Sequence, residues 1–186
     1  MIYRIWNWNS IQSKIRMSLN EDPERLEVDL KGKKVSESRT TMTEFVLPND
    51  ANTHGNVLGG KVMHLMDLAA AITAFRHCRN PVVTVSVDSV RFLHPVKVGA
   101  VMMFEAVITR AFKSSMEIRV QVISEDLISG EQLKTCSAYL TFVAIDRQGE
   151  PTLVPPILPE TDEEQERFEA ALIRREHRLR LASKEV

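Results

Sequence analysis

The hydrophobic and polar positions of the chain predict one long buried helix followed by four strands. Between Gly60 and Cys78, apolar or small residues occupy nearly every face of a helix, which is typical of a helix that is covered on most sides. Beyond this segment, β-branched residues and two-residue alternation indicate strands with one buried face. The expected strands are 82–92 with a bulge near Ser89, 101–112, 116–124 and 134–145.

A fifth strand is expected ahead of the helix, at 39–47, where a Thr-rich alternating stretch ends at a polar loop. One helix among five strands in this order indicates an α+β fold with a five-stranded antiparallel sheet. A strongly curved sheet wrapped around the helix would cover it as its composition requires.

The two ends of the chain look different from this central part. Residues 1–38 are expected to form an N-terminal extension, in which 21–38 mix charges with little periodicity, as an exposed lead-in does. Residues 1–20 lack acids, as a transit peptide does, but they also lack its density of Ser and Arg. The domain is expected at 39–158. Residues 159–186 favour a charged C-terminal helix that packs on a neighbour or projects into solvent.

Composition places the chain among soluble globular proteins. Of its 186 residues 44% are hydrophobic and 26% charged, and the formal net charge of −1 provides no general attraction to nucleic acid. No apolar run reaches the ~20 residues that span a bilayer. The two cysteines, Cys78 and Cys136, lack the spacing of a disulfide scaffold or a zinc site. We therefore expect a cytoplasmic protein without a metal site.

Asp67 is the main candidate for chemistry because it interrupts an apolar helix. A carboxylate in that position needs a hydrogen-bond partner or a cavity, and either catalysis or capping of a neighbouring strand would satisfy it. Helical periodicity places His64 and Gly60 on the same face as Asp67. The first N–H groups of the helix, near Gly59 and Gly60, lack intrahelical partners and can stabilise an oxyanion, although a Gly pair is equally typical of a simple turn.

Several motifs in a fixed order resemble those of the hotdog-fold acyl-CoA thioesterases. They are PNDANTHGNVLGG, HLMD, RHC, VVTVSVDSVRFLHPVKVG, KSSMEIRV and AYLTFVAID. The resemblance is to the brain-type and bacterial short-to-medium-chain acyl-CoA hydrolases and covers about residues 39–158. It implies a hotdog fold, acyl-CoA as substrate, no cofactor beyond the coenzyme A of substrate and product, and a homodimer that assembles further as a trimer of dimers.

The resemblance also implies a hydrolytic site at Asn52, Asp67 and Thr84, with the asparagine and the aspartate contributed by different subunits. Some bacterial relatives carry a key acid where this chain has Asn56. An amide at that position can orient the substrate or donate a hydrogen bond, but it cannot act as a base.

Thioester hydrolysis requires a water activated by a carboxylate, and donors for the carbonyl oxygen. Asp67 is the candidate base, with a nucleophilic role as the alternative. Asn52 would position water or thioester, and Thr84 would hold the carboxylate or the water. Backbone N–H groups around Gly59 and Gly60 would supply the oxyanion hole.

For several other polar residues, an ordinary structural role is the alternative to a functional one. Lys113, Ser114 and Ser115 are candidates for contacts with the phosphates of coenzyme A, or they form an ordinary turn. His54 and His64 are not accompanied by a G-x-S-x-G motif, which favours loop hydrogen bonds over a His-based mechanism.

Two other functions compete with hydrolysis. A catalytically silent hotdog module would bind acyl-CoA or nucleotide, but the presence of Asn52, Asp67 and Thr84 together argues against silence. A hotdog hydratase or dehydratase would need a catalytic His with an acid in a different loop context, which the NDANTHGN loop does not resemble.

Overall fold

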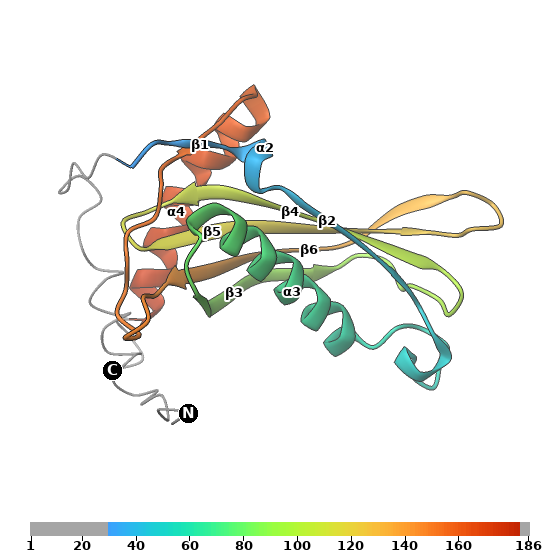
Figure 1. Cartoon of the computed structure of the whole chain (residues 1–186). Coiled ribbons are helices and arrows are strands. Elements are labelled where there is room, and N and C mark those ends of the chain that lie inside the picture. The colour runs from blue at the N-terminus through green and yellow to red at the C-terminus, as the bar shows by residue number, and fades with distance from the viewer. Residues whose placement is uncertain (1–29, 183–186) are drawn as a thin grey trace.

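The computed structural model describes residues 30–182, in which helices lie on both faces of a five-stranded sheet (Figure 1). The strands of this sheet are β2 (Thr40–Phe45), β3 (Val82–Phe92), β4 (Val101–Ala111), β5 (Ser115–Glu125) and β6 (Gln132–Ala144). The long helices are α3 (Gly59–Cys78) and α4 (Asp162–Ala182). The short elements are β1 (Lys33–Lys34), α2 (Val35–Ser38), the 3₁₀ turn η1 (Pro48–Asp50) and β7 (Ile157–Leu158). The predicted α+β architecture is confirmed.

The five-stranded sheet is antiparallel and has the order β2-β4-β5-β6-β3. Strand β3 therefore lies at an edge, paired with β6 on one side. Its register shifts between Thr84 and Ser86 and again between Asp88 and Arg91, so the irregularity expected near Ser89 is confirmed and a second one precedes it. The free side of β3 leaves backbone groups available for pairing with another strand.

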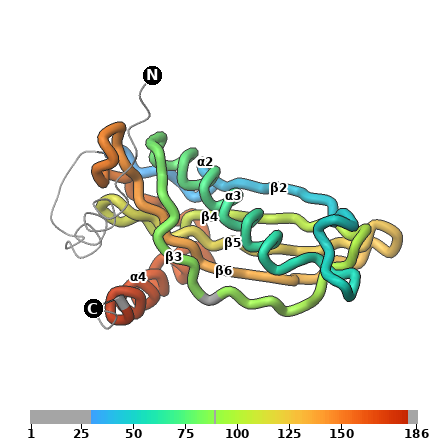
Figure 2. The backbone as a smooth tube through the Cα atoms, turned by 90° about the horizontal axis from the view of Figure 1, so that it is seen from below, coloured from blue at the N-terminus to red at the C-terminus, as the bar shows by residue number. Residues whose placement is uncertain are grey.

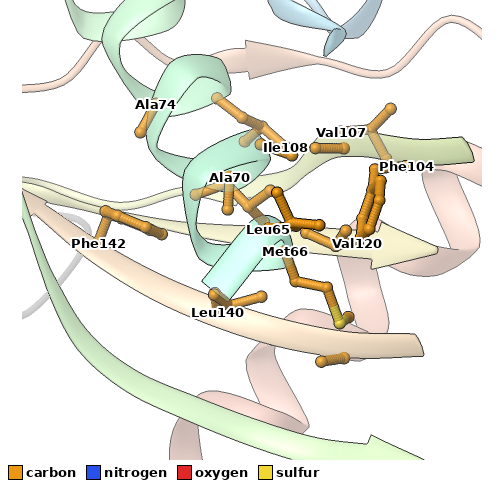
Figure 3. Close-up of a cluster of buried hydrophobic side chains, with 14 of the residues drawn as sticks. Leu65, Met66, Ala70, Ala74, Phe104, Val107, Ile108, Val120, Leu140 and Phe142 are labelled. Carbon is orange, nitrogen blue, oxygen red and sulfur yellow. The ribbon is translucent and has the colours of Figure 1, made fainter. Parts of the chain in front are cut away.

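The core lies between α3 and one face of the sheet, called here the inner face (Figure 3). Leu65, Met66 and Ala70 of α3 are at most 5% exposed and point toward the strands. The strand residues that face them alternate along the chain; in β5 they are Met116, Ile118, Val120 and Val122, each 0% exposed. Because full burial of a large apolar side chain contributes about 1.5–3 kcal/mol, this layer accounts for the position of α3.

The opposite side of α3 remains open in the single chain. Met63, Leu68 and Phe75 are 44%, 42% and 47% exposed. The sheet of one chain covers one side of α3, so the expected burial of this helix on most sides is not reached within the single chain.

Helix α4 lies on the other face of the sheet, called here the outer face (Figures 1 and 2). Its Arg174 and Arg178 bind Glu117 of β5, whose side chain is 0% exposed. The expectation that this helix packs on a neighbour or projects into solvent is therefore wrong. It is held on the sheet of its own chain by the packing of Phe168 and Ala171 and by ionic hydrogen bonds. A search for an apolar stripe does not detect the ionic hydrogen bonds.

The last part of the predicted N-terminal extension belongs to the folded domain. Lys33 pairs with Ile157 in a parallel two-stranded sheet, and Val35 and Ser38 are 2% and 0% exposed. The expectation of an exposed lead-in is thus wrong at Val35 and Ser38. The transit-peptide hypothesis concerns 1–20, which lie outside the described residues.

Two absences hold for the part of the chain that the structure describes. No helix there is long and apolar enough to cross a membrane. No group of three or more His, Cys, Asp or Glu side chains there could hold a metal ion.

Candidate functional site

The side chains of Asp67 and Thr84 meet between helix α3 and edge strand β3. Thr84 Oγ1 donates a hydrogen bond of 2.8 Å to Asp67 Oδ1, and both residues are half-buried. Thr84 faces the helix because it pairs with Phe142, an inner-face residue of β6. The strand thus fixes one carboxylate oxygen, while Oδ2 has no hydrogen-bond partner among residues 30–182.

A cavity of about 220 Å³ adjoins Asp67 and is called here the inner cavity. Its other lining residues are mostly apolar; they are Gly60, Met63, His64, Met66, Val87, Val90, Ala138 and Leu140. A carboxylate beside such a space can hold and deprotonate a water molecule, and the apolar wall offers room for a hydrocarbon chain. The predicted common face of Gly60, His64 and Asp67 is confirmed, since all three line this cavity.

Asn52 lies in a different place within the same chain. Its Oδ1 accepts hydrogen bonds from the backbone N–H groups of His54, at 2.9 Å, and Asn56, at 3.2 Å. Asn52 is exposed and lines a separate cavity of about 350 Å³ together with Asn56 and Gly59. A single chain therefore joins Asp67 with Thr84 but does not bring Asn52 to them.

Cys136 also lines the cavity near Asn52, but its thiol is unsuited to nucleophilic chemistry. Its Sγ lies 3.6 Å from Met66 Sδ in the buried core. Burial raises the pKa of the Cys136 thiol above its usual value, an effect that outweighs a backbone hydrogen bond at Ser137. The thiol therefore stays protonated near neutral pH.

The N-terminus of α3 carries the Gly pair expected to form the oxyanion hole. The helix begins at Gly59, its N-cap residue Leu58 is extended, and no side chain caps it. A Cβ on Gly60 would meet nothing within 4 Å, whereas one on Gly59 would touch the Phe92 ring at 3.4 Å. The first N–H groups of α3 are thus available to a substrate oxygen, and Gly60 leaves an open approach to them.

The turn at 113–115 lies apart from Asp67. Ser114 and Ser115 are 4% and 3% exposed, so their hydroxyl groups are not displayed on the surface of the chain. Ser115 faces another cavity, on the outer face of the sheet beneath α4. The structure therefore does not bring these residues together with Asp67 and Thr84.

Residues of the inner cavity wall were not recognised from the sequence as part of a site. Val87, Ala138 and Leu140 alternate as inner-face residues of β3 and β6, and the same pattern is typical of ordinary core. Their position beside Asp67 depends on the pairing of β3 with β6. Alternation extended from Thr84 along β3 would not have found Val87, because the register shift between Thr84 and Ser86 changes which residues face inward.

Comparison with known proteins relates the chain to thioesterases. The model of the thioesterase superfamily matches residues 54–130. The Bacillus subtilis acyl-CoA thioester hydrolase YkhA is 44% identical over 128 residues, which are 69% of this chain and 74% of that protein. The cytosolic acyl coenzyme A thioester hydrolase of Rattus norvegicus is 38% identical over 137 residues, 73% of this chain but 36% of that protein. The chain thus spans about a third of the rat relative.

Solved structures share the fold. A hexameric acyl-CoA thioesterase, crystallised without ligand, superimposes with a TM-score of 0.80 at 40% identity and covers 82% of this chain and 98% of its own. The Staphylococcus aureus acyl-CoA hydrolase in complex with butyryl coenzyme A and coenzyme A has a TM-score of 0.76 at 40% identity, over 82% of this chain and 94% of its own. The predicted hotdog fold is confirmed by this likeness.

Three further structures of the Staphylococcus aureus protein carry alanine in place of an aspartate, a threonine or an asparagine. In that chain the asparagine precedes the aspartate by 15 positions, and the aspartate precedes the threonine by 17. Asn52, Asp67 and Thr84 have the same two separations.

Proposed function

Because this chain belongs to the acyl-CoA thioester hydrolases of the thioesterase superfamily, we propose that it hydrolyses fatty acyl-CoA to a free acid and coenzyme A. The observation that carries this function is the hydrogen bond between Thr84 and Asp67 beside an apolar cavity. An oriented carboxylate next to space for a hydrocarbon chain is what water attack on an acyl thioester requires.

Asp67 acts as the general base in this mechanism. Thr84 holds Oδ1, so Oδ2 is the oxygen that accepts a proton from the attacking water. The water oxygen bonds to the carbonyl carbon, the carbon–sulfur bond then breaks, and the sulfur of coenzyme A leaves with the bonding electron pair. The proton held by Asp67 is finally released to the thiolate or to solvent, and no further cofactor takes part.

The N-terminus of α3 stabilises the transition state. As water adds, the carbonyl oxygen becomes negative, and uncapped N–H groups at Gly59 and Gly60 can donate to it. The dipole of a 20-residue helix adds a partial positive charge at the same end. Asn56 orients the substrate in this proposal.

The complete site is shared between two chains. Within one chain Asn52 and Asp67 line different cavities, whereas the exposed side of α3 and the free edge of β3 adjoin Asp67. A second chain that pairs along β3 would cover Met63 and Val87, which are 44% and 46% exposed, and would bring its own Asn52 loop to the inner cavity. The substitutions at corresponding separations in the Staphylococcus aureus protein support the same three residues.

Assembly and location follow as part of this proposal. The chain forms a homodimer through β3, and three dimers form a hexamer, as the hexameric neighbour suggests. The protein works in the cytoplasm, in keeping with the cytosolic rat relative.

The phosphates of coenzyme A are contacted by Lys113, Ser114 and Ser115 in this proposal. These contacts require that the turn at 113–115 opens or is approached from another subunit.

The test is a panel of acyl-CoA substrates from acetyl to palmitoyl, with release of free thiol as the readout. Wild-type protein is expected to hydrolyse a contiguous range of chain lengths. The Asp67→Asn variant keeps the shape of the side chain but loses the base, so kcat should fall about 100-fold or more. Near wild-type turnover in folded Asp67→Asn protein would contradict the mechanism. Binding of acyl-CoA without turnover of any chain length by wild-type protein would favour a silent module.

A further inference from the structure

A cavity of about 380 Å³ lies on the outer face of the sheet, between β3, β6 and the C-terminal half of α4. It is called here the outer cavity. Its volume falls within the range of small-molecule sites. Val85, Phe112 and Leu179 form an apolar wall, so part of the space suits a hydrocarbon group. The outer cavity is separated by the sheet from the inner cavity, which contains Asp67.

Thr141 lines the outer cavity and carries a buried hydroxyl group. It is 3% exposed, and its Oγ1 is fully buried without a hydrogen-bond partner in the described part of the chain. By contrast, Thr109 on the same face donates a 2.6 Å hydrogen bond to Glu117. A buried hydroxyl without a partner costs about 1–3 kcal/mol, and an oxygen atom of a ligand in the cavity would relieve that cost.

Two guanidinium groups of α4 line the outer cavity beside Thr141. Arg178 is fixed by Asp88 at 3.0 Å and by Glu117 at 2.8 Å. The Arg175 guanidinium lies over the Phe112 ring, 4.7 Å from its centroid. Asp88 also faces the cavity, but Arg178 neutralises it. Planar guanidinium groups bind carboxylates and phosphates through paired N–H donors, and the apolar wall beside them favours a carboxylate that carries a hydrocarbon chain.

We propose that the outer cavity binds a fatty acid, with its carboxylate at Thr141 and the α4 arginines and its chain against Val85, Phe112 and Leu179. The identity of this ligand rests on the proposed function, because a fatty acid is the product of the hydrolysis. The ligand would touch Val85 and Ser86, which directly follow Thr84 on β3. Occupancy of the outer cavity therefore acts on the strand that orients Asp67, and the fatty acid inhibits hydrolysis without competing with acyl-CoA.

Binding is tested with octanoate and full-length protein, by calorimetry and by the NMR shift of a ¹³C-labelled carboxylate. The Asp67→Asn variant, saturated with coenzyme A, should still bind octanoate. Thr141→Val, which removes only the hydroxyl, should weaken binding about 3- to 10-fold. Leu179→Trp should fill the cavity and abolish binding, whereas Leu172→Trp should not. Leu172 lies on the same helix, is 37% exposed, and does not line the cavity.

Kinetics gives an independent readout. In wild-type protein octanoate should lower kcat and leave KM unchanged, and Leu179→Trp should lose this inhibition while keeping its basal activity. The neutral analogue 1-octanol should bind at least about tenfold more weakly, because it lacks the charge that the arginines recognise. Displacement of octanoate by coenzyme A, or loss of coenzyme A binding in Leu179→Trp, would overturn the proposal and assign the cavity to the substrate. Unchanged octanoate binding in Leu179→Trp would also overturn it. All of these binding outcomes can be measured whether or not the protein hydrolyses acyl-CoA.

Discussion

The carboxylates on the two faces of the sheet differ in burial and in the number of hydrogen bonds that they accept. On the outer face, Glu117 is 0% exposed and accepts hydrogen bonds from Thr109, Arg174 and Arg178. On the inner face, Asp67 is half-buried and receives one hydrogen bond, from Thr84. A carboxylate with all its acceptor capacity used can hold two elements together. A carboxylate with a free oxygen beside a cavity can accept a proton.

The same contrast holds for the two long helices. Helix α4 lies on the outer face through residues whose charges are neutralised there, and Arg174 also stacks over the Tyr139 ring, 3.9 Å from its centroid. Helix α3 buries one apolar side and leaves Leu68 and Phe75 exposed. The outer face is therefore covered by a helix of the same chain, whereas the inner layer leaves apolar side chains of α3 exposed, where the proposed dimer would cover them.

The largest effect is expected on the outer face, from removal of the buried carboxylate. Glu117→Ala leaves Arg174 and Arg178 without their shared partner, and loss of one side of a buried ion pair costs about 3–5 kcal/mol. The free energy of unfolding should fall by that amount in chemical denaturation at a fixed protein concentration. The control is Glu163→Ala, which removes an exposed partner of Arg167 and should cost less than about 1 kcal/mol. Equal losses of unfolding free energy in the two variants would contradict a special stabilising role for Glu117 and its two arginine partners.

Two threonines sharpen the comparison because each binds a carboxylate on a different face. Thr84→Val removes the hydrogen bond to Asp67, and since a hydrogen bond to a charged group contributes about 1.5–3 kcal/mol, kcat should fall about tenfold or more. Thr109→Val removes the hydrogen bond to Glu117 and should lower stability by about 1.5 kcal/mol at unchanged kcat. Thiol release and denaturation are measured on both variants. The assignment fails if Thr109→Val loses turnover or if Thr84→Val loses stability alone.

A subunit-mixing experiment tests whether the inner layer is completed by a partner. Asn52→Ala and Asp67→Ala are each expected to be inactive, and a mixed dimer with a shared site would carry both lesions in one site and neither in the other. At equal mixing about half the dimers are mixed, so about a quarter of wild-type activity should return. Subunit exchange is followed with two affinity tags. Exchange without recovered hydrolysis would mean that Asn52 and Asp67 of one site come from the same chain.

The inner layer was largely predictable from the sequence, and the outer layer was not. Alternation in 116–124 identified the residues that face α3, because apolar side chains are periodic there. Asp67 stood out as an acid in an apolar helix, and the resemblance paired it with Thr84. The position of α4 was harder to predict. Besides the packing of Phe168, it depends on Arg174 and Arg178, which bind Glu117, 57 and 61 residues away in the sequence. The burial of Val35 was also not predicted, because a single apolar residue in a charged segment gives no periodic hydrophobic pattern.

The smallest effect is expected at His77, a buried polar residue near the end of α3 that has one hydrogen bond from its ring. Its side chain is 0% exposed, and Nε2–H donates to the Pro155 carbonyl at 2.7 Å. Burial lowers the pKa of His77 below its usual 6.5, and Lys33 adds to this effect, while the Pro155 hydrogen bond and Glu37 oppose it. The folded state therefore takes up the His77 proton at a lower pH than the unfolded state.

The consequence is a loss of stability in mild acid. Well above pH 6.5 His77 is neutral in both states, and its contribution to the free energy of unfolding does not vary with pH. As pH falls through 6.5, the unfolded state binds the proton first, so stability declines until the pH drops below the lowered pKa of the folded state. His77→Gln has no ring to protonate and should show a flatter profile over this interval. Denaturation midpoints of both proteins from pH 8 to 5 measure the difference, and parallel profiles would show that His77 is not the group responsible.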